Sequence, residues 1–207
     1  MKSSKTQPPR KSVVLGITGA SGAVYALGLL RQLCLQRLPV DLIISSNGWN
    51  LLRLEAGIKD EKSLLSYPGV GKFPTEGIRL HDNQNLDSPL SSGSYPVRGM
   101  VICPCSTKTL SAVATGACRS LIERAAEVML KERRPLLLVT RESPYSLTQI
   151  ENMRSATLAG AIVLPASPAF YHRPKTIADL VDFIVARVLD QLGLAQTLVK
   201  PWEGRQL

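Results

Sequence analysis

Short, mostly apolar runs alternate along this chain with longer stretches of helical periodicity, and this order constrains the fold more than any other feature. Strands that are apolar on both sides are typical of parallel sheets covered on both faces by helices. The sequence therefore predicts an α/β protein. The apolar runs lie at residues 12–18, 40–45, 99–106, 135–140 and 161–166, and IRLHDN at 78–83 is a further candidate strand.

The segments between these runs have apolar residues at spacings of three and four, which is the helical period. Periodicity weakens between Lys59 and Arg98, where Gly, Pro and Ser accumulate. Together the elements predict one Rossmann-like (flavodoxin-like) domain with a doubly wound parallel sheet at 12–207, after a flexible basic tail at 1–11. Helices are expected at 22–36, 47–57 with Asn47 as N-cap, 107–117, 120–134, 146–159 and 176–193.

The composition is that of a globular protein rather than of a membrane or nucleic-acid-binding protein. No apolar run approaches the roughly 18 residues that a membrane-spanning helix needs. The formal net charge of +9 falls partly in the tail and is otherwise scattered, which argues against binding to nucleic acid. The start of the chain lacks the apolar stretch of a secretory signal. We expect a cytoplasmic protein with neither a membrane nor a nucleic acid as its partner.

Cysteine and histidine usage argues against metal chemistry. The four cysteines lie in apolar or small-residue surroundings without CxxC spacing, which favours reduced, buried thiols over a disulfide framework or a zinc site. Two histidines, His81 and His172, are too few for a multi-histidine metal centre. We therefore expect no metal in the site.

Ligands of doubly wound sheets bind at the carboxyl ends of the strands, near the point where the strand order reverses. The first such end carries GITGASGA at 16–23, whose small residues admit a ligand and whose following helix offers N–H groups to an anion. Its glycine spacing differs from that of dinucleotide sites, and the second strand ends in Ser45-Ser46-Asn47 rather than in an acid, so NAD is disfavoured. The alternative is that GITGASGA is a turn that only packs the first helix against the first strand and binds no ligand.

Three further strand ends carry polar or basic side chains. CSTKT at 105–109 places three hydroxyls and an ammonium at a helix start, where they hold a phosphate or flavin or merely cap the helix. RESP at 141–144 contains an arginine and a glutamate that can form ion pairs at the end of a buried strand; the alternative is a loop that only contacts solvent. AFYHRP at 169–174 gathers aromatic and basic residues in a loop. All three belong to the edge of the sheet that carries GITGASGA.

Cations on two predicted helices are candidates for a second anion site. Arg124 and Lys131 are seven residues apart and share a helix face, where they hold one phosphate or form a charged surface stripe. Arg187 lies at the margin of the apolar stripe of the last helix, where it points at an anion or extends to solvent.

Four separated motifs, GITGASGA, MVICPCSTKTLSAVATGA, LIERAAEVMLKERRPLLLVTRESP and PAFYHRP, resemble those of the UbiX family of flavin prenyltransferases, in order and spacing, from about Val13 to Trp202. The resemblance implies an FMN-binding subunit of a homododecamer. Such enzymes join a dimethylallyl group from dimethylallyl phosphate to N5 and C6 of reduced FMN. The product, prenylated FMN, serves a UbiD-type decarboxylase in ubiquinone biosynthesis or aromatic-acid decarboxylation.

The resemblance also implies the site residues. Breaking an allylic C–O bond without a metal requires cations for the departing phosphate, an acid to protonate it and π faces for the developing cation. On this chemistry we expect Glu142 to move protons, which pass between it and the substrate through the Ser21 hydroxyl. The full expected set is Gly19, Ala20, Ser21, Ser45, Ser106, Thr107, Lys108, Thr109 and Arg141 for FMN; Arg124, Lys131, Tyr171 and Arg187, partly from neighbouring subunits, for dimethylallyl phosphate; and Ser21, Glu55, Glu142 and Trp202 as catalytic residues.

Two other functions are compatible with this fold. The first is an FMN-dependent cysteine decarboxylase of the related family; PCSTKT stands where that family has PASANT, and its catalytic histidine has no convincing counterpart here. The second is a non-enzymatic flavin carrier, which leaves the phosphate-binding cations unexplained. The sequence does not choose between dimethylallyl monophosphate and pyrophosphate.

Overall fold

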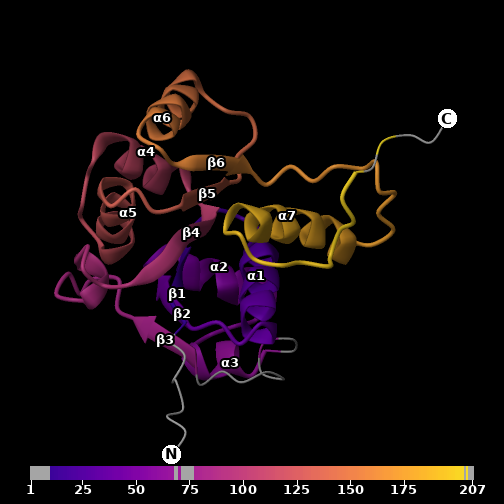
Figure 1. The fold of residues 1–207 in the computed structure, drawn as a ribbon, viewed down its shortest axis with the longest axis horizontal. Helices are drawn as coiled ribbons and strands as arrows, with labels where there is room; N and C mark the ends of the chain where they lie inside the picture. Colours follow the sequence, from indigo (N-terminus) through magenta and orange to yellow (C-terminus); the bar gives the residue numbers. More distant parts are fainter. Residues whose placement is uncertain (1–9, 68–69, 71–76, 203, 205–207) are drawn as a thin grey trace, which may run out of the picture.

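Six parallel strands form one sheet in the computed structural model, which describes residues 10–67, 70, 77–202 and 204. The strand order is β3-β2-β1-β4-β5-β6 (Figure 1). This confirms the predicted α/β fold, with the strand order of the dinucleotide-binding Rossmann sheet. The strands are β1 (Ser12–Ile17), β2 (Val40–Ile44), β3 (Ile78–His81), β4 (Val97–Cys105), β5 (Leu136–Thr140) and β6 (Ile162–Pro165).

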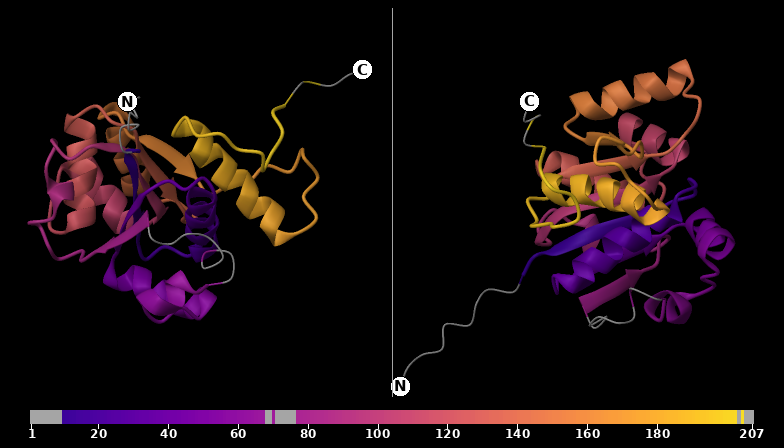
Figure 2. Two further views of the ribbon diagram at one scale, coloured as in Figure 1. Left: turned by 60° about the horizontal axis from the view of Figure 1, so that its bottom comes forward. Right: turned by 90° about the vertical axis from the view of Figure 1, so that its right-hand side faces the viewer.

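Helices cover both faces of the sheet because alternate residues of each strand point to opposite sides. In β1, Val13, Leu15 and Ile17 belong to one hydrophobic cluster and Val14 to the other. The first cluster is completed by α1 (Ala23–Leu35) and α7 (Ile177–Gln191), with Leu52 of α2 (Ser46–Ala56) and Leu64 of α3 (Glu61–Leu65). The second contains residues of α4 (Thr107–Thr115), α5 (Leu121–Lys131) and α6 (Leu147–Leu158). The left view of Figure 2 shows α7, in yellow, well separated from the helices drawn in rose.

Most predicted elements are found within a residue or two of their expected ends. The N-cap of α2 was predicted wrongly, because Ser45 rather than Asn47 caps it: Ser45 Oγ accepts the Gly48 amide at 3.0 Å. The weakly periodic region holds α3, β3 and a 3-10 turn at Pro89–Ser91. Residues 1–9 of the expected tail lie outside the described residues, so the division at residue 11 stays a prediction.

The strand order reverses between β1 and β4, and one hydroxyl joins the ends of these strands. Thr18 Oγ1 donates to the Pro104 carbonyl and accepts the Ser106 amide, both at 2.8 Å. Nearby, α2 starts in close contact with β1, since a Cβ at Gly48 would lie 2.5 Å from the Ile17 carbonyl oxygen. These contacts bring the first residues of α2 and α4 to the same edge of the sheet.

A buried carboxylate ties β1, β2 and β3 together away from that edge. Asp41 is fully buried and accepts a hydrogen bond from Ser12 Oγ at 2.6 Å and two from Arg79 at 2.8 and 2.9 Å. His81 Nε2 lies 2.8 Å from the same carboxylate, and His81 Nδ1 lies 3.2 Å from Ser88 Oγ. Burial alone raises the pKa of Asp41, but the bonds from Arg79, Ser12 and His81 outweigh it and hold the pKa below its usual value.

In the part of the chain that the structure describes, no helix is both long and apolar enough to cross a membrane.

Replacing Asp41 by Asn is expected to lower the free energy of unfolding by about 1 to 2 kcal/mol at neutral pH, because the hydrogen bonds from Ser12, Arg79 and His81 lose a charged acceptor, whereas Arg79 is 47% exposed and keeps its charge in water. The pKa of Asp41 is lower in the folded than in the unfolded protein, so its stabilisation is present above about pH 4 and is lost as the pH falls through the folded pKa. The free energy of unfolding, measured with urea, should therefore fall less between neutral and acid pH in Asp41→Asn than in the unchanged protein. The exposed Asp87→Asn is the control; a similar loss of stability in both variants would contradict the prediction.

Candidate functional site

A polar hollow of about 560 Å³ opens where β1, β2 and β4 end, at the reversal of the strand order. Its walls come from the ends of four strands and from the first turns of α2, α4 and α5. Hydroxyl and amide side chains dominate the walls, with one ammonium and one guanidinium. The lining residues are Thr18, Gly19, Ser45, Ser46, Asn47, Asn83, Gln84, Ser106, Thr107, Lys108, Thr109, Arg119, Ser120, Ile122 and Glu123.

The start of α4 gives the hollow an anion-binding end. Ser106 caps the helix, with its Oγ 3.3 Å from the amide of Thr109. The side chain of Lys108 is 83% exposed, so its ammonium is accessible. The first amides of a helix have no acceptor within the helix, and they favour negative charge. This donor set suits the phosphate of FMN, so the residues present fit the expected cofactor. The capping role of Ser106 and the ligand role proposed from the sequence are thus compatible.

Six of the nine residues expected to bind FMN line this hollow: Gly19, Ser45, Ser106, Thr107, Lys108 and Thr109. The remaining three, Ala20, Ser21 and Arg141, lie beside it. Arg141 Nε donates to the Ser21 carbonyl at 3.0 Å, which connects the end of β5 to the GASGA turn.

The sequence suggested that the amides at the start of α1 bind a ligand, but in the structure they bind Glu55. Glu55 Oε2 accepts the amides of Gly22 at 3.0 Å and Ala23 at 2.8 Å. Gly19 is required by a protein contact, since a Cβ there would lie 2.5 Å from the Cβ of Asn47. The amides of Gly22 and Ala23 are therefore not free for an anion, and the expected contacts of Gly19, Ala20 and Ser21 with FMN stay a prediction. The turn holds the carboxylate of its own chain.

Ser21, Glu55 and Arg141 form a second polar cluster at the GASGA turn, whose Gly19 lines the hollow. Partial burial raises the pKa of Glu55, but hydrogen bonds from Ser21, Ala23 and Gly22 and the charge of Arg141 outweigh it and lower the pKa below its usual value. Glu55 is thus a carboxylate at neutral pH. Glu142 follows Arg141, and its Oε1 accepts the Ser143 amide at 3.1 Å. In the described residues the Ser21 hydroxyl helps to lower the pKa of Glu55, whereas the sequence linked Ser21 to Glu142.

Arg124 and Lys131 lie on the outer side of α5, each paired with an acid. Arg124 Nη1 is 2.5 Å from Glu127 Oε2, and Lys131 Nζ is 2.5 Å from Glu132 Oε1. Seven residues of helix separate them along the axis by about 10 Å. The shared face predicted from the spacing does not by itself bring both cations to one phosphate.

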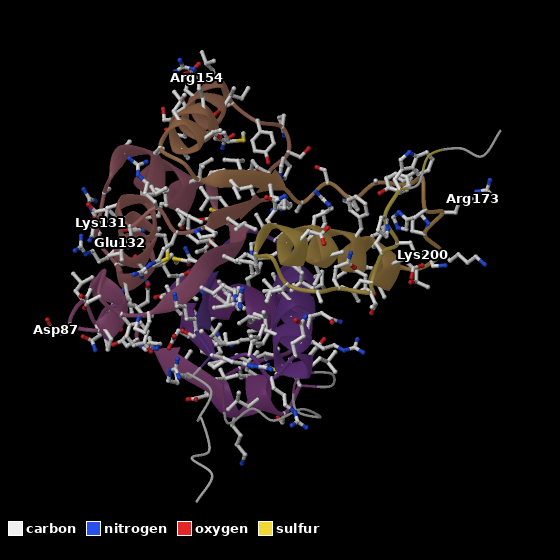
Figure 3. The ribbon with its side chains drawn as sticks, viewed as in Figure 1. Asp87, Lys131, Glu132, Arg154, Arg173 and Lys200 are labelled. Atoms are coloured by element: carbon white, nitrogen blue, oxygen red, sulfur yellow. The ribbon has the colours of Figure 1, made fainter. Side chains whose placement is uncertain are left out.

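Tyr171 and Trp202 meet on the far side of the molecule. Their ring centroids are 5.2 Å apart in an edge-to-face arrangement, and both side chains are exposed. Arg187 of α7 donates to Asp190 at 2.8 Å. Figure 3 shows Lys131 at one end of the long axis and Arg173, two residues after Tyr171, at the other end. One chain therefore holds the predicted dimethylallyl phosphate ligands in two distant groups.

Sequence reasoning missed nine of the fifteen residues that line the hollow, among them Thr18, Asn47, Asn83 and Glu123. Thr18 was read only as part of the glycine turn, and Asn47 as a helix cap. Asn83 accepts the amide of Leu121 through its carbonyl at 2.8 Å and that of Ile122 through Oδ1 at 3.1 Å. Its position at the end of the third strand was a usable signal. Glu123 had no such signal, because it is one acid among several on its helix.

Across the described residues, no group of three or more His, Cys, Asp or Glu is placed to hold a metal ion. Cys34, Cys103 and Cys105 are buried, and all four cysteines are unbridged. Burial raises the pKa of Cys105 to about 12, so its thiol is protonated at neutral pH.

Residues 1–189 match the family model described as Flavoprotein. The chain is 45% identical to the flavin prenyltransferase UbiX of Pseudomonas aeruginosa over 203 residues, which cover 94% of this chain and 95% of the relative. It is 42% identical to the flavin prenyltransferase UbiX of Aquifex aeolicus over 196 residues, covering 94% of this chain and the whole of that relative.

Solved structures agree with these relatives. A crystal structure of AnUbiX (PadA1) in complex with FMN and dimethylallyl pyrophosphate is similar at a TM-score of 0.86 and 35% identity, covering 95% of this chain and 100% of that one. A dodecameric FMN-dependent UbiX-like decarboxylase from Escherichia coli O157:H7 has a TM-score of 0.83 and 35% identity, covering 93% and 100%.

The polar hollow at the strand reversal and the near-complete match to these relatives agree, and the chain belongs to the UbiX family of flavin prenyltransferases.

Proposed function

We propose that this chain transfers a dimethylallyl group from a dimethylallyl phosphate ester to N5 and C6 of reduced FMN. The observation that carries the proposal is the hollow with its anion-binding end at Thr107 and Lys108, next to the cluster of Ser21, Glu55 and Arg141. Such a site binds a phosphate-bearing ring system and places ionisable groups at its exposed edge. Its near-full-length relatives carry the same activity in their names.

Reduced FMN, when bound, supplies the nucleophilic nitrogen and carbon. The allylic C–O bond breaks with its electrons leaving on the phosphate, while one bond forms to N5 and one to C6. Of the two protons that these atoms release, one goes to the phosphate and one to the middle carbon of the dimethylallyl group. The chain has to neutralise the phosphate, stabilise positive charge on the allyl group and carry protons.

The described residues can meet these needs. Arg124, Lys131 and Arg187 neutralise phosphate charge. The exposed rings of Tyr171 and Trp202 provide π faces for a cation. Glu55 stays ionised and orients Ser21, and Glu142 is the remaining acid beside Arg141 that can exchange protons with solvent.

The cations of α5 and α7 serve one substrate only if they come from different chains. The two helices pack on opposite faces of the sheet, so no single chain presents both sets at one point. The dodecameric relative from Escherichia coli supports an assembly of copies. We further propose a homododecamer whose product serves a UbiD-type decarboxylase, with the cytoplasm as its location.

The cysteine decarboxylase alternative is disfavoured by the position of the histidines. His81 is held between Asp41 and Ser88 and does not line the hollow. His172 stacks on Phe183, next to Tyr171. The likeness to the peptidyl-cysteine decarboxylase EpiD, at 13% identity, shows the fold alone.

The direct test is anaerobic incubation of the protein with reduced FMN and dimethylallyl phosphate, followed by mass spectrometry of the flavin. The flavin mass should increase by one C5H8 unit. A parallel reaction with dimethylallyl pyrophosphate determines which ester is used. Bound but unmodified FMN with both esters would support the flavin-carrier alternative instead.

Replacing Glu142 by Gln should lower kcat by on the order of a hundredfold, because the site loses a group that exchanges protons. The FMN dissociation constant, measured by flavin fluorescence, should stay the same. The control is Glu61→Gln, an exposed acid of α3. Normal turnover by Glu142→Gln would remove Glu142 from the mechanism.

Arg124→Ala and Arg187→Ala should each abolish turnover when purified alone. Assembled together in equal amounts, the two variants should recover about a quarter of the parent activity, because one site in four then draws both intact cations from different chains. Flavin mass after a fixed time gives the measurement. A mixture as inactive as its components would show that both cations act from one chain.

A further inference from the structure

Glu123 is the one strongly buried acid in the wall of the hollow, and neither the sequence reading nor the mechanism above gives it a role. Its side chain is 5% exposed, although the residue lies in the first turn of α5. Its Oε2 accepts the Arg119 amide at 2.7 Å. In the described structure, the nearest partner of its Oε1 is Lys108 Nζ, at 3.9 Å, beyond hydrogen-bond distance. Oε1 is not fully enclosed by protein, so in the described structure it is open to the hollow that Glu123 lines, where a ligand can reach it.

The hydrogen bonds around Glu123 indicate where in the hollow the phosphate of FMN can bind. The amides of Arg119, Leu121 and Ile122 at the start of α5 are already bound by Glu123 and Asn83. The start of α5 is therefore a poor place for a phosphate. The start of α4, with Lys108, is a better one, because in the described residues Ser106 Oγ takes the Thr109 amide and leaves those of Thr107 and Lys108 to a ligand.

Glu123 thus lies beside the phosphate end of the hollow, near Lys108. The donors of FMN next to its phosphate are the hydroxyls of the ribityl chain, whereas the N–H groups of the ring are at the other end. A carboxylate repels phosphate but accepts strong hydrogen bonds from hydroxyl groups. Both facts favour the ribityl chain as its partner.

Resting on the proposed function, we propose that Glu123 is a further flavin-binding residue, which accepts a hydrogen bond from a ribityl hydroxyl through Oε1 and so selects ribityl flavins over flavins with a plain alkyl chain. The bond places the sugar chain against α5. It also satisfies the one carboxylate oxygen of this wall that the protein leaves without a donor.

The test compares two ligands that both carry the phosphate: FMN and a flavin whose ribityl chain is replaced by an unsubstituted pentyl phosphate chain. Dissociation constants are measured by flavin fluorescence with the full-length protein. Their ratio cancels the repulsion between Glu123 and the phosphate, which affects both ligands alike. The parent should bind FMN at least tenfold more tightly than the analogue, since a hydrogen bond to a charged group is worth about 1.5 kcal/mol or more.

Glu123→Ala should reduce this ratio by about tenfold, and Glu123→Gln, which keeps an acceptor for the Arg119 amide, by about threefold. Glu151→Gln, an exposed acid of α6, should leave the ratio unchanged. Thermal unfolding without flavin checks that each variant is folded, and the Gln variant keeps the test valid if the Ala variant is not.

A ratio near one in the parent, or a ratio that Glu123→Gln leaves intact, would overturn the proposal while the prenyltransferase function stands. A parent protein that binds neither ligand would overturn both.

Discussion

Burial of the sheet on both faces restricts where this protein can place chemistry. The four central strands, β2, β1, β4 and β5, are covered by apolar residues of α1 and α7 on one side and of α4 to α6 on the other. Polar side chains that meet a ligand are therefore gathered at the carboxyl ends of the strands. Thr18 fixes the geometry there, because its hydroxyl bonds to both Pro104 and Ser106 and so joins the two strands between which the order reverses.

Side chains of the protein itself occupy the amides at some of the helix starts around the hollow and leave others free for a ligand. Glu55 takes the first amides of α1, and Asn83 and Glu123 take those of α5. The start of α4 is then the place with both amides and an accessible ammonium for a phosphate. Four helices, α1, α2, α4 and α5, begin at this edge of the sheet. In the described residues α2 and α4 keep unpaired amides in their first turns, and the start of α4 also has the ammonium of Lys108 beside them. The protein's own carboxylates and amide carbonyls thus limit where an anionic ligand can bind.

The separation of the substrate ligands links catalysis to assembly. Arg124 and Lys131 lie on α5, while Tyr171 and Arg187 belong to α7 and the loop before it, across the sheet. A single chain forms the hollow but does not present both groups at one point. The proposed oligomer would therefore complete the active site as well as stabilise the fold. Flavin binding and prenyl transfer should depend differently on assembly.

The sequence by itself determined the sheet, the helices and six of the residues that line the hollow, because apolar runs and helical periodicity are local signals and strand ends of a parallel sheet share one edge. It could not tell that Glu55, far along the chain, would occupy the turn at Ser21 and Gly22, nor that Glu123 would be buried while Glu127, on the same helix, stays accessible. Those outcomes depend on contacts between distant segments, since the burial of a charge is set by what packs over it. Tertiary structure alone decided that the starts of α1 and α5 are occupied by the chain itself, whereas those of α2 and α4 remain open to a ligand.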